Sequence, residues 1–159
     1  MWLFNLFKKS KKGNNQFENL NNKCDSAFKE SFSRCRVEFG REMVQIMNMK
    51  SAIIEKINSV NGCTPVQEML AEKMLELMYV YFNTVNAYVS AKRGAGSETE
   101  ILEGMKDKIN RVYNLINDLN KQFYLNTDKV AGVTQCDEVI NEAQALCNVI
   151  KNHNNKHKL

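Results

Sequence analysis

Five cysteines and two histidines are the residues of this sequence best suited to nucleophilic or metal chemistry. The cysteines are Cys24, Cys35, Cys63, Cys136 and Cys147. Cys63 lies just before a helix-start signal at Thr64, and the N-terminus of a helix can lower the pKa of a thiol. No histidine lies near Cys63 in the sequence to act as its base, and an unassisted thiol is a weak candidate for catalysis. A thiol enzyme that uses Cys63 is therefore the least favoured of three functional hypotheses.

The spacing of the other cysteines and of the histidines does not predict a metal site. Cys24 and Cys35 are eleven residues apart, as are Cys136 and Cys147, which is about three helical turns. Antiparallel helices could place Cys24 beside Cys147 and Cys35 beside Cys136 as two disulfides, but only if the first segment folds back. We therefore expect small buried thiols instead. The sequence has no Cys-x-x-Cys or Glu-x-x-His pair, and its histidines, His153 and His157, lie in a polar tail. We expect no metal, no cofactor and no enzymatic activity.

The positive charge of the chain is concentrated at its N-terminus. Residues 1–12 contain no acidic residue and four basic ones: Lys8, Lys9, Lys11 and Lys12. Without these four, the chain has 18 basic and 18 acidic residues, so the body is formally neutral. A basic groove is therefore not predicted, and nucleic acid is an unlikely partner.

Apolar residues directly precede these lysines, and the four that we consider membrane-binding candidates are Trp2, Leu3, Phe4 and Phe7. Aromatic side chains favour the membrane interface, and lysines are attracted to anionic headgroups. The second functional hypothesis is therefore a peripheral membrane protein that docks through these eight residues. The same segment packed against the fold, or left in solvent, would have no such role.

The fold is expected to be organised around one long helix between Phe17 and Val60. Apolar residues recur there every three or four positions without a proline, which indicates an amphipathic helix of roughly 66 Å. The first part of its apolar stripe consists of Phe17, Leu20, Cys24, Phe28 and Phe32.

Three shorter helices are predicted after it. Thr64 with Gln67 forms a capping box that opens a helix to about Lys92. Ser97 with Glu100 opens the next helix, and Thr134 with Asp137 opens the last. Short links and one proline predict an all-α, up-down bundle of about four helices. The expected divisions are a flexible arm (1–16) with a hinge at Gly13–Asn15, a bundle (17–152) and a polar tail (153–159).

The first helix is too long for this bundle. Its neighbours should each span roughly 43 Å, so the part before Phe32 has no partner unless it folds back. We favour a second chain as its cover, because Gly40 is only a mild helix breaker. The leading hypothesis is therefore a non-enzymatic protein–protein interaction module of the adaptor, chaperone or regulator type. It would bury Phe17, Leu20, Cys24, Phe28 and Phe32 against a protein partner or a second copy.

The expected location is the cytoplasm, or the inner face of a membrane if the arm binds lipid. The number of cysteines is odd and no secretory signal is evident, and both features favour a reducing compartment.

Overall fold

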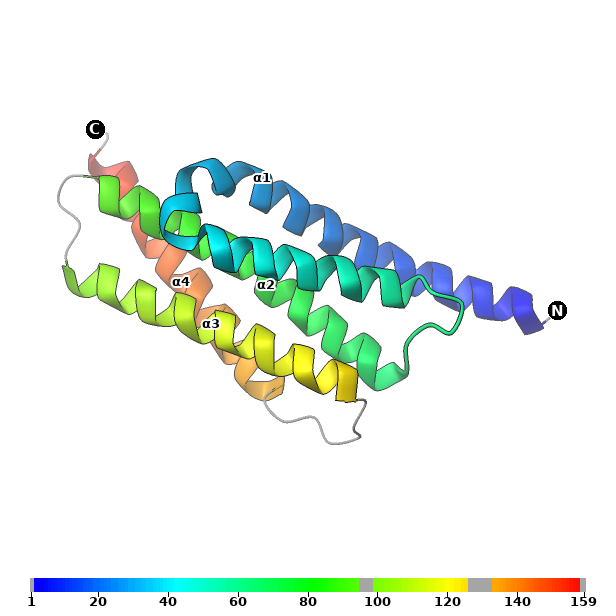
Figure 1. Cartoon of the computed structure of the whole chain (residues 1–159). Coiled ribbons are helices and arrows are strands. Elements are labelled where there is room, and N and C mark those ends of the chain that lie inside the picture. Colours follow the sequence, from blue (N-terminus) through cyan, green and yellow to red (C-terminus); the bar gives the residue numbers. More distant parts are fainter. Residues whose placement is uncertain (1, 95–98, 126–132, 158–159) are drawn as a thin grey trace.

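The computed structural model describes the backbone of residues 2–94, 99–125 and 133–157, and the side chains of 16–94, 99–125 and 133–152. Its helices are α1 (Trp2–Ile57), α2 (Pro65–Arg93), α3 (Thr99–Leu125) and α4 (Val133–His157) (Figure 1). The described residues contain no strand. The predicted all-α bundle with a long first helix is therefore confirmed.

α2 is the central helix of the bundle, because each of the other three packs more extensively against α2 than against any other helix. Its buried side chains occur on almost every side of the helix, which is typical of a helix enclosed by others. Tyr81 and Phe82, which are neighbours in sequence, are both almost fully buried. The expectation that residues 17–60 organise the fold is therefore wrong, since the other helices gather around α2.

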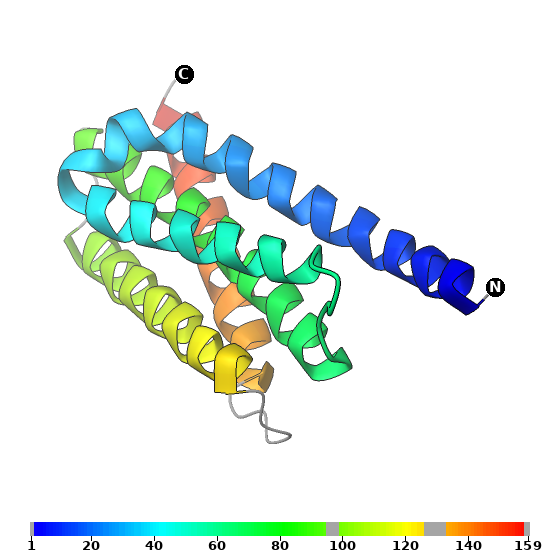
Figure 2. The ribbon, with the colours of Figure 1, turned by 45° about the vertical axis from the view of Figure 1, so that its right-hand side comes forward.

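α1 does not run straight but doubles back on itself (Figures 1 and 2). The Lys50 ammonium lies 2.9 Å from the Asp25 carboxylate. In a straight helix, residues this far apart in sequence would be separated by about 37 Å. The fold-back, rather than a straight helix of 66 Å, is therefore how the chain accommodates the long apolar stripe.

The position of the reversal follows from the contacts between α1 and α2. These contacts advance along both helices as far as the ion pair between Glu38 and Lys92. They reverse at Phe39, whose ring meets that of Tyr88 with centroids 5.7 Å apart. We call the three parts of α1 the outward limb (residues 17–34), the bend (35–40) and the return limb (41–57).

α3 runs antiparallel to α2, as predicted for helices joined by short links. The ring of Tyr81 in α2 lies beside that of Tyr113 in α3, and Gln67 near the start of α2 donates a hydrogen bond to the Phe123 carbonyl near the end of α3. α4 then returns along α2, where Lys73 forms an ion pair with Asp137 at 2.8 Å.

The predicted start of α2 is confirmed in detail. The Thr64 hydroxyl accepts the backbone N–H of Gln67 at 3.1 Å, and the Gln67 side chain accepts the backbone N–H of Thr64 at 3.0 Å. Gly62 has the left-handed backbone expected of a C-cap, with φ of 62°, although α1 itself ends earlier, at Ile57. Ser97 lies outside the described residues.

Two predicted boundaries differ from the structure. The expected hinge at Gly13–Asn15 is helical, because α1 continues through it from Trp2. The expected polar tail is also helical for most of its length, because α4 extends to His157. Both segments lack a proline, so nothing in them prevents a neighbouring helix from propagating.

Candidate functional site

The N-terminal arm is the helical beginning of α1. Its side chains, including all eight residues predicted to bind a membrane, lie outside the described side chains. Its position relative to the bundle is nevertheless given by the backbone and by the first described contacts of α1.

The register between α1 and α2 shows how far the arm extends. The Gln16 amide donates to the Glu72 carboxylate at 2.6 Å, and the Arg34 guanidinium donates to the Ser90 hydroxyl at 3.0 Å. Both pairs are separated by 56 positions in sequence, so the outward limb runs parallel to α2. Pro65, where α2 begins, is then level with about residue 9. Residues 2–8 therefore extend past the start of α2 by about 10 Å. Figures 1 and 2 show the start of α1 projecting beyond the other helices.

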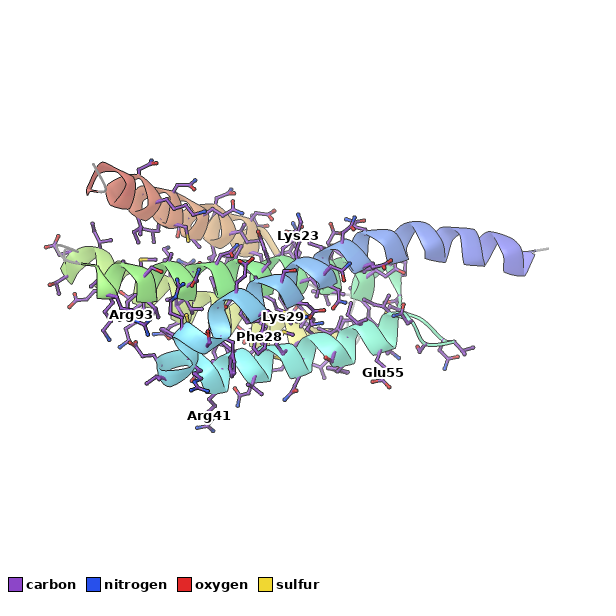
Figure 3. The ribbon with its side chains drawn as sticks, turned by 90° about the horizontal axis from the view of Figure 1, so that it is seen from above. Lys23, Phe28, Lys29, Arg41, Glu55 and Arg93 are labelled. Atoms are coloured by element: carbon purple, nitrogen blue, oxygen red, sulfur yellow. The ribbon has the colours of Figure 1, made fainter. Side chains whose placement is uncertain are left out.

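The five residues predicted to contact a partner lie together on the outward limb, but they face the chain's own core. Cys24 is fully buried and Phe17 is 6% exposed. Three others are half-buried against the same core: Leu20, Phe28 and Phe32. The Phe28 ring meets that of Phe82 in α2 edge-on, with centroids 5.6 Å apart. The premise that this stripe lacks an intramolecular cover is therefore wrong, because the bend returns it to α2 and to the return limb (Figure 3).

A polar cluster that the sequence reasoning missed joins the two limbs of α1. We call Asn21, Asp25 and Lys50 the latch. The Lys50 ammonium donates to the Asn21 side-chain oxygen and pairs with the Asp25 carboxylate. The Lys50 side chain is 6% exposed, whereas that of Asp25 is 39% exposed. The sequence feature that could have revealed the latch is the position of Lys50 among the apolar residues of α1, because a buried charge requires a partner.

The cysteines behave as structural thiols. All five are free. The two considered disulfides, Cys24–Cys147 and Cys35–Cys136, therefore do not form, even though the first segment folds back. Burial raises the pKa of the Cys24 thiol to about 12 and that of Cys35 to about 11. Burial also raises the pKa of Cys63, which is opposite to the effect expected from the adjacent helix N-terminus. A raised pKa lowers the thiolate fraction and therefore the reactivity of a cysteine.

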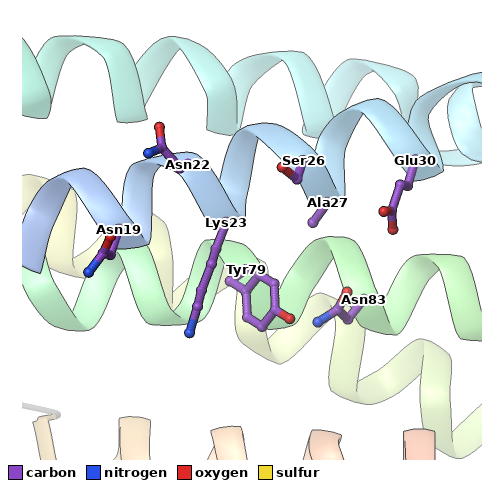
Figure 4. Close-up of a pocket in the computed structure, with 8 residues that line it drawn as sticks. All are labelled: Asn19, Asn22, Lys23, Ser26, Ala27, Glu30, Tyr79 and Asn83. Carbon is purple, nitrogen blue, oxygen red and sulfur yellow. The ribbon is translucent and has the colours of Figure 1, made fainter.

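A shallow hollow of about 450 Å³ lies between the outward limb and α2 (Figure 4). The Lys23 ammonium lies over the Tyr79 ring, 5.9 Å from its centroid. The other lining residues are Asn19, Asn22, Ser26, Ala27, Glu30 and Asn83. Its charged side chains, Lys23 and Glu30, are both exposed to solvent. The hollow therefore offers hydrogen bonds to water, and we assign it no catalytic role.

Within the described side chains, no group of three potential metal ligands comes together. The side chains of His153 and His157 are not among those described. None of the helices in the described part of the chain combines the length and the apolar character that crossing a bilayer requires.

No family model, curated protein or solved structure matches this chain.

Proposed function

We propose that this protein docks reversibly to anionic membrane surfaces through its N-terminal arm. The observation that carries the proposal is the register of α1 against α2, which extends residues 2–8 past the start of α2. Residues 2–7 are the apolar part of the arm, Lys8 directly follows them, and the other three lysines lie where α1 reaches the end of the bundle.

The sequence of the arm suits a helix that lies at a membrane surface. At about 100° per residue, positions 2, 3, 6 and 7 fall within an arc of about 140°. All four are large and apolar, whereas Lys8 and Lys12 fall on the opposite side. Lys9 and Lys11 lie just beyond the two edges of the apolar arc, and Phe4 falls on the side of the lysines. A helix with one apolar side and one lysine-rich side lies in the interface between headgroups and acyl chains.

The charge distribution favours an anionic surface. Each lysine near such a surface contributes about 1 kcal/mol, so four contribute about 4 kcal/mol, which is about a thousandfold in partitioning. The rest of the chain is formally neutral, so it neither adds to this attraction nor opposes it. Because the attraction is electrostatic, salt should weaken it.

The test is flotation with vesicles of phosphatidylcholine, with or without phosphatidylserine. Trp2 is the only tryptophan in the chain, so intrinsic tryptophan fluorescence reports on the arm itself. The charge variant replaces the arm lysines by glutamine: Lys8, Lys9, Lys11 and Lys12. A matched control replaces four exposed lysines of the bundle and has the same net charge: Lys29, Lys106, Lys121 and Lys151.

We expect the wild type and the control to float with the anionic vesicles and to show a blue shift of Trp2 emission. The arm variant should stay in solution, and high salt should release the wild type. Equal binding by the arm variant and the control would refute the proposal. Absence of binding by the wild type to the anionic vesicles would refute it as well.

A further inference from the structure

The bend of α1 is built from sequence that also fits a straight helix. The backbone remains helical on both sides of it and through it, and residues 35–40 contain no proline. Sharp changes of direction in helices usually occur at proline, at glycine or serine, or at an inserted residue. The mild breakers here are Gly40 and the buried Ser31, whose hydroxyl donates to the carbonyl four residues earlier at 2.6 Å. Local sequence therefore does not strongly favour the bent form over a straight one.

The outward limb is held by contacts with α2 and with the return limb. Phe28 packs against Phe82 of α2, and the Cys24 thiol donates to the Leu75 carbonyl at 3.3 Å. The latch joins the outward limb to the return limb. The outward limb of a second copy would find the same surface, because α2 and the return limb stay in place when the bend opens.

We propose that α1 also adopts a straight form, in which two copies of this chain exchange their outward limbs. In this domain-swapped dimer the two α1 helices run antiparallel, and each latch forms between copies. The contacts of the outward limb are preserved, so the two forms differ mainly at the bend. The inference is independent of lipid binding, because it concerns residues 17–57 and not the arm.

Arg36 disfavours the exchanged form. The latch pairs Lys50 with Asn21 and Asp25. Residues 36 and 37 lie at the middle of the sequence interval between Lys50 and these two partners. The two-fold axis of the dimer therefore passes close to residue 36. On a straight helix, position 36 is also in line with Asp25 and Lys50, because steps of 11 and 14 residues are close to whole numbers of turns. The two Arg36 guanidinium groups then face each other, whereas Arg36 of the bent form is exposed to solvent.

Substitution of Gly40 is a second way to shift the equilibrium between the bent monomer and the exchanged dimer. A Cβ added at Gly40 would lie 3.3 Å from the Arg36 Cβ in the bent form, which is tighter than an ordinary van der Waals contact. A straight helix has no such contact, because Cβ atoms four residues apart in a regular helix are about 5–6 Å apart. Gly104 is a matched control in α3, because a Cβ there meets nothing within 4 Å.

The test is light scattering after size-exclusion chromatography, over a range of protein and salt concentrations. We expect the wild type to be mainly monomeric at low salt, with a dimer fraction that rises with concentration and with salt. Arg36→Leu and Gly40→Ala should each raise the dimerisation constant several-fold. The controls Arg41→Leu and Gly104→Ala should behave as the wild type, because position 41 lies on the opposite face of a straight α1.

Cross-linking identifies which limb is exchanged. The double variant Asp25→Cys with Lys50→Cys is treated with a short bismaleimide cross-linker in the monomer and dimer fractions and run on a denaturing gel, beside the wild type treated in the same way. A swapped dimer gives a band at twice the chain mass of 18.3 kDa, and the monomer fraction does not. A dimer that runs at the monomer mass would overturn the proposal, as would equal dimerisation of the test variants and their controls.

Discussion

Removing Asp25 should destabilise this protein much more than removing the charge of Lys50, although the two groups share one ion pair. The Lys50 side chain is 6% exposed and that of Asp25 is 39% exposed. Asp25→Ala leaves a buried ammonium whose remaining partner in the latch is Asn21. Lys50→Met leaves a carboxylate that water can reach, and it keeps an apolar side chain of similar length in the core.

The magnitudes follow from the burial of each charge. Breaking a buried ion pair by removing one partner costs about 3–5 kcal/mol. The partial exposure of Asp25 and the remaining Asn21 amide reduce this, so we expect Asp25→Ala to cost about 2–3 kcal/mol. Replacing a buried charge by a well-packed apolar group is often neutral, so Lys50→Met should stay within about 1 kcal/mol of the wild type. The double variant should resemble Lys50→Met, because no buried charge remains.

Urea denaturation followed by far-ultraviolet circular dichroism measures all three variants. For a chain of this size, the loss in Asp25→Ala corresponds to a decrease of about 4–12 °C in melting temperature. The reasoning would be refuted if Lys50→Met were as damaging as Asp25→Ala. It would also be refuted if the double variant were less stable than both single variants.

Thr64→Ala should lower the free energy of unfolding by about 1 kcal/mol, because the Thr64 hydroxyl caps α2; an unchanged urea midpoint would contradict this. Burial raises the pKa of the Cys24 thiol to about 12 and that of Cys35 to about 11, from 9.0. The unfolded chain therefore loses these protons first, so this contribution to stability is complete below pH 9 and is lost as the pH rises towards 11–12. A urea midpoint that is constant above pH 9 would argue against buried thiols. The double change Phe28→Asp with Phe32→Asp should destabilise the protein by several kcal/mol, and wild-type melting would show that the outward limb does not pack within the chain.

Helix positions could be predicted from this sequence because local chemistry determines them. The capping box at Thr64 supplies its own hydrogen bonds, and Gly62 supplies a left-handed turn whatever the tertiary contacts. The apolar stripe of α3 likewise repeats at the helical period, and its members are buried as this period requires. None of these inferences needed information about other parts of the chain.

The path of α1 could not be predicted in the same way, because apolar periodicity is unaffected by a change of direction. The outward and return limbs both carry a regular stripe, and both stripes face the core of the same chain. The central role of α2 was missed for a related reason. Its apolar residues surround the helix, so a search for one stripe underestimates how enclosed it is.

Two charged residues of α1, Lys50 and Arg36, carry the information about topology that the apolar stripe lacks. Lys50 requires a carboxylate or an amide at its own level, and an antiparallel helix bearing Asn21 and Asp25 provides both. A folded-back limb and an exchanged limb satisfy this requirement equally. The latch therefore fixes how the outward limb aligns with the return limb, but not whether the two limbs belong to the same chain. Arg36 does distinguish the two forms, because pairing two chains in that register brings two guanidinium groups together, whereas the bend leaves each one in solvent. On this reasoning Arg36 and the glycine four residues after it favour the single folded chain, in addition to the contacts that the bend makes with α2. The variants at these two positions test their share of this preference directly.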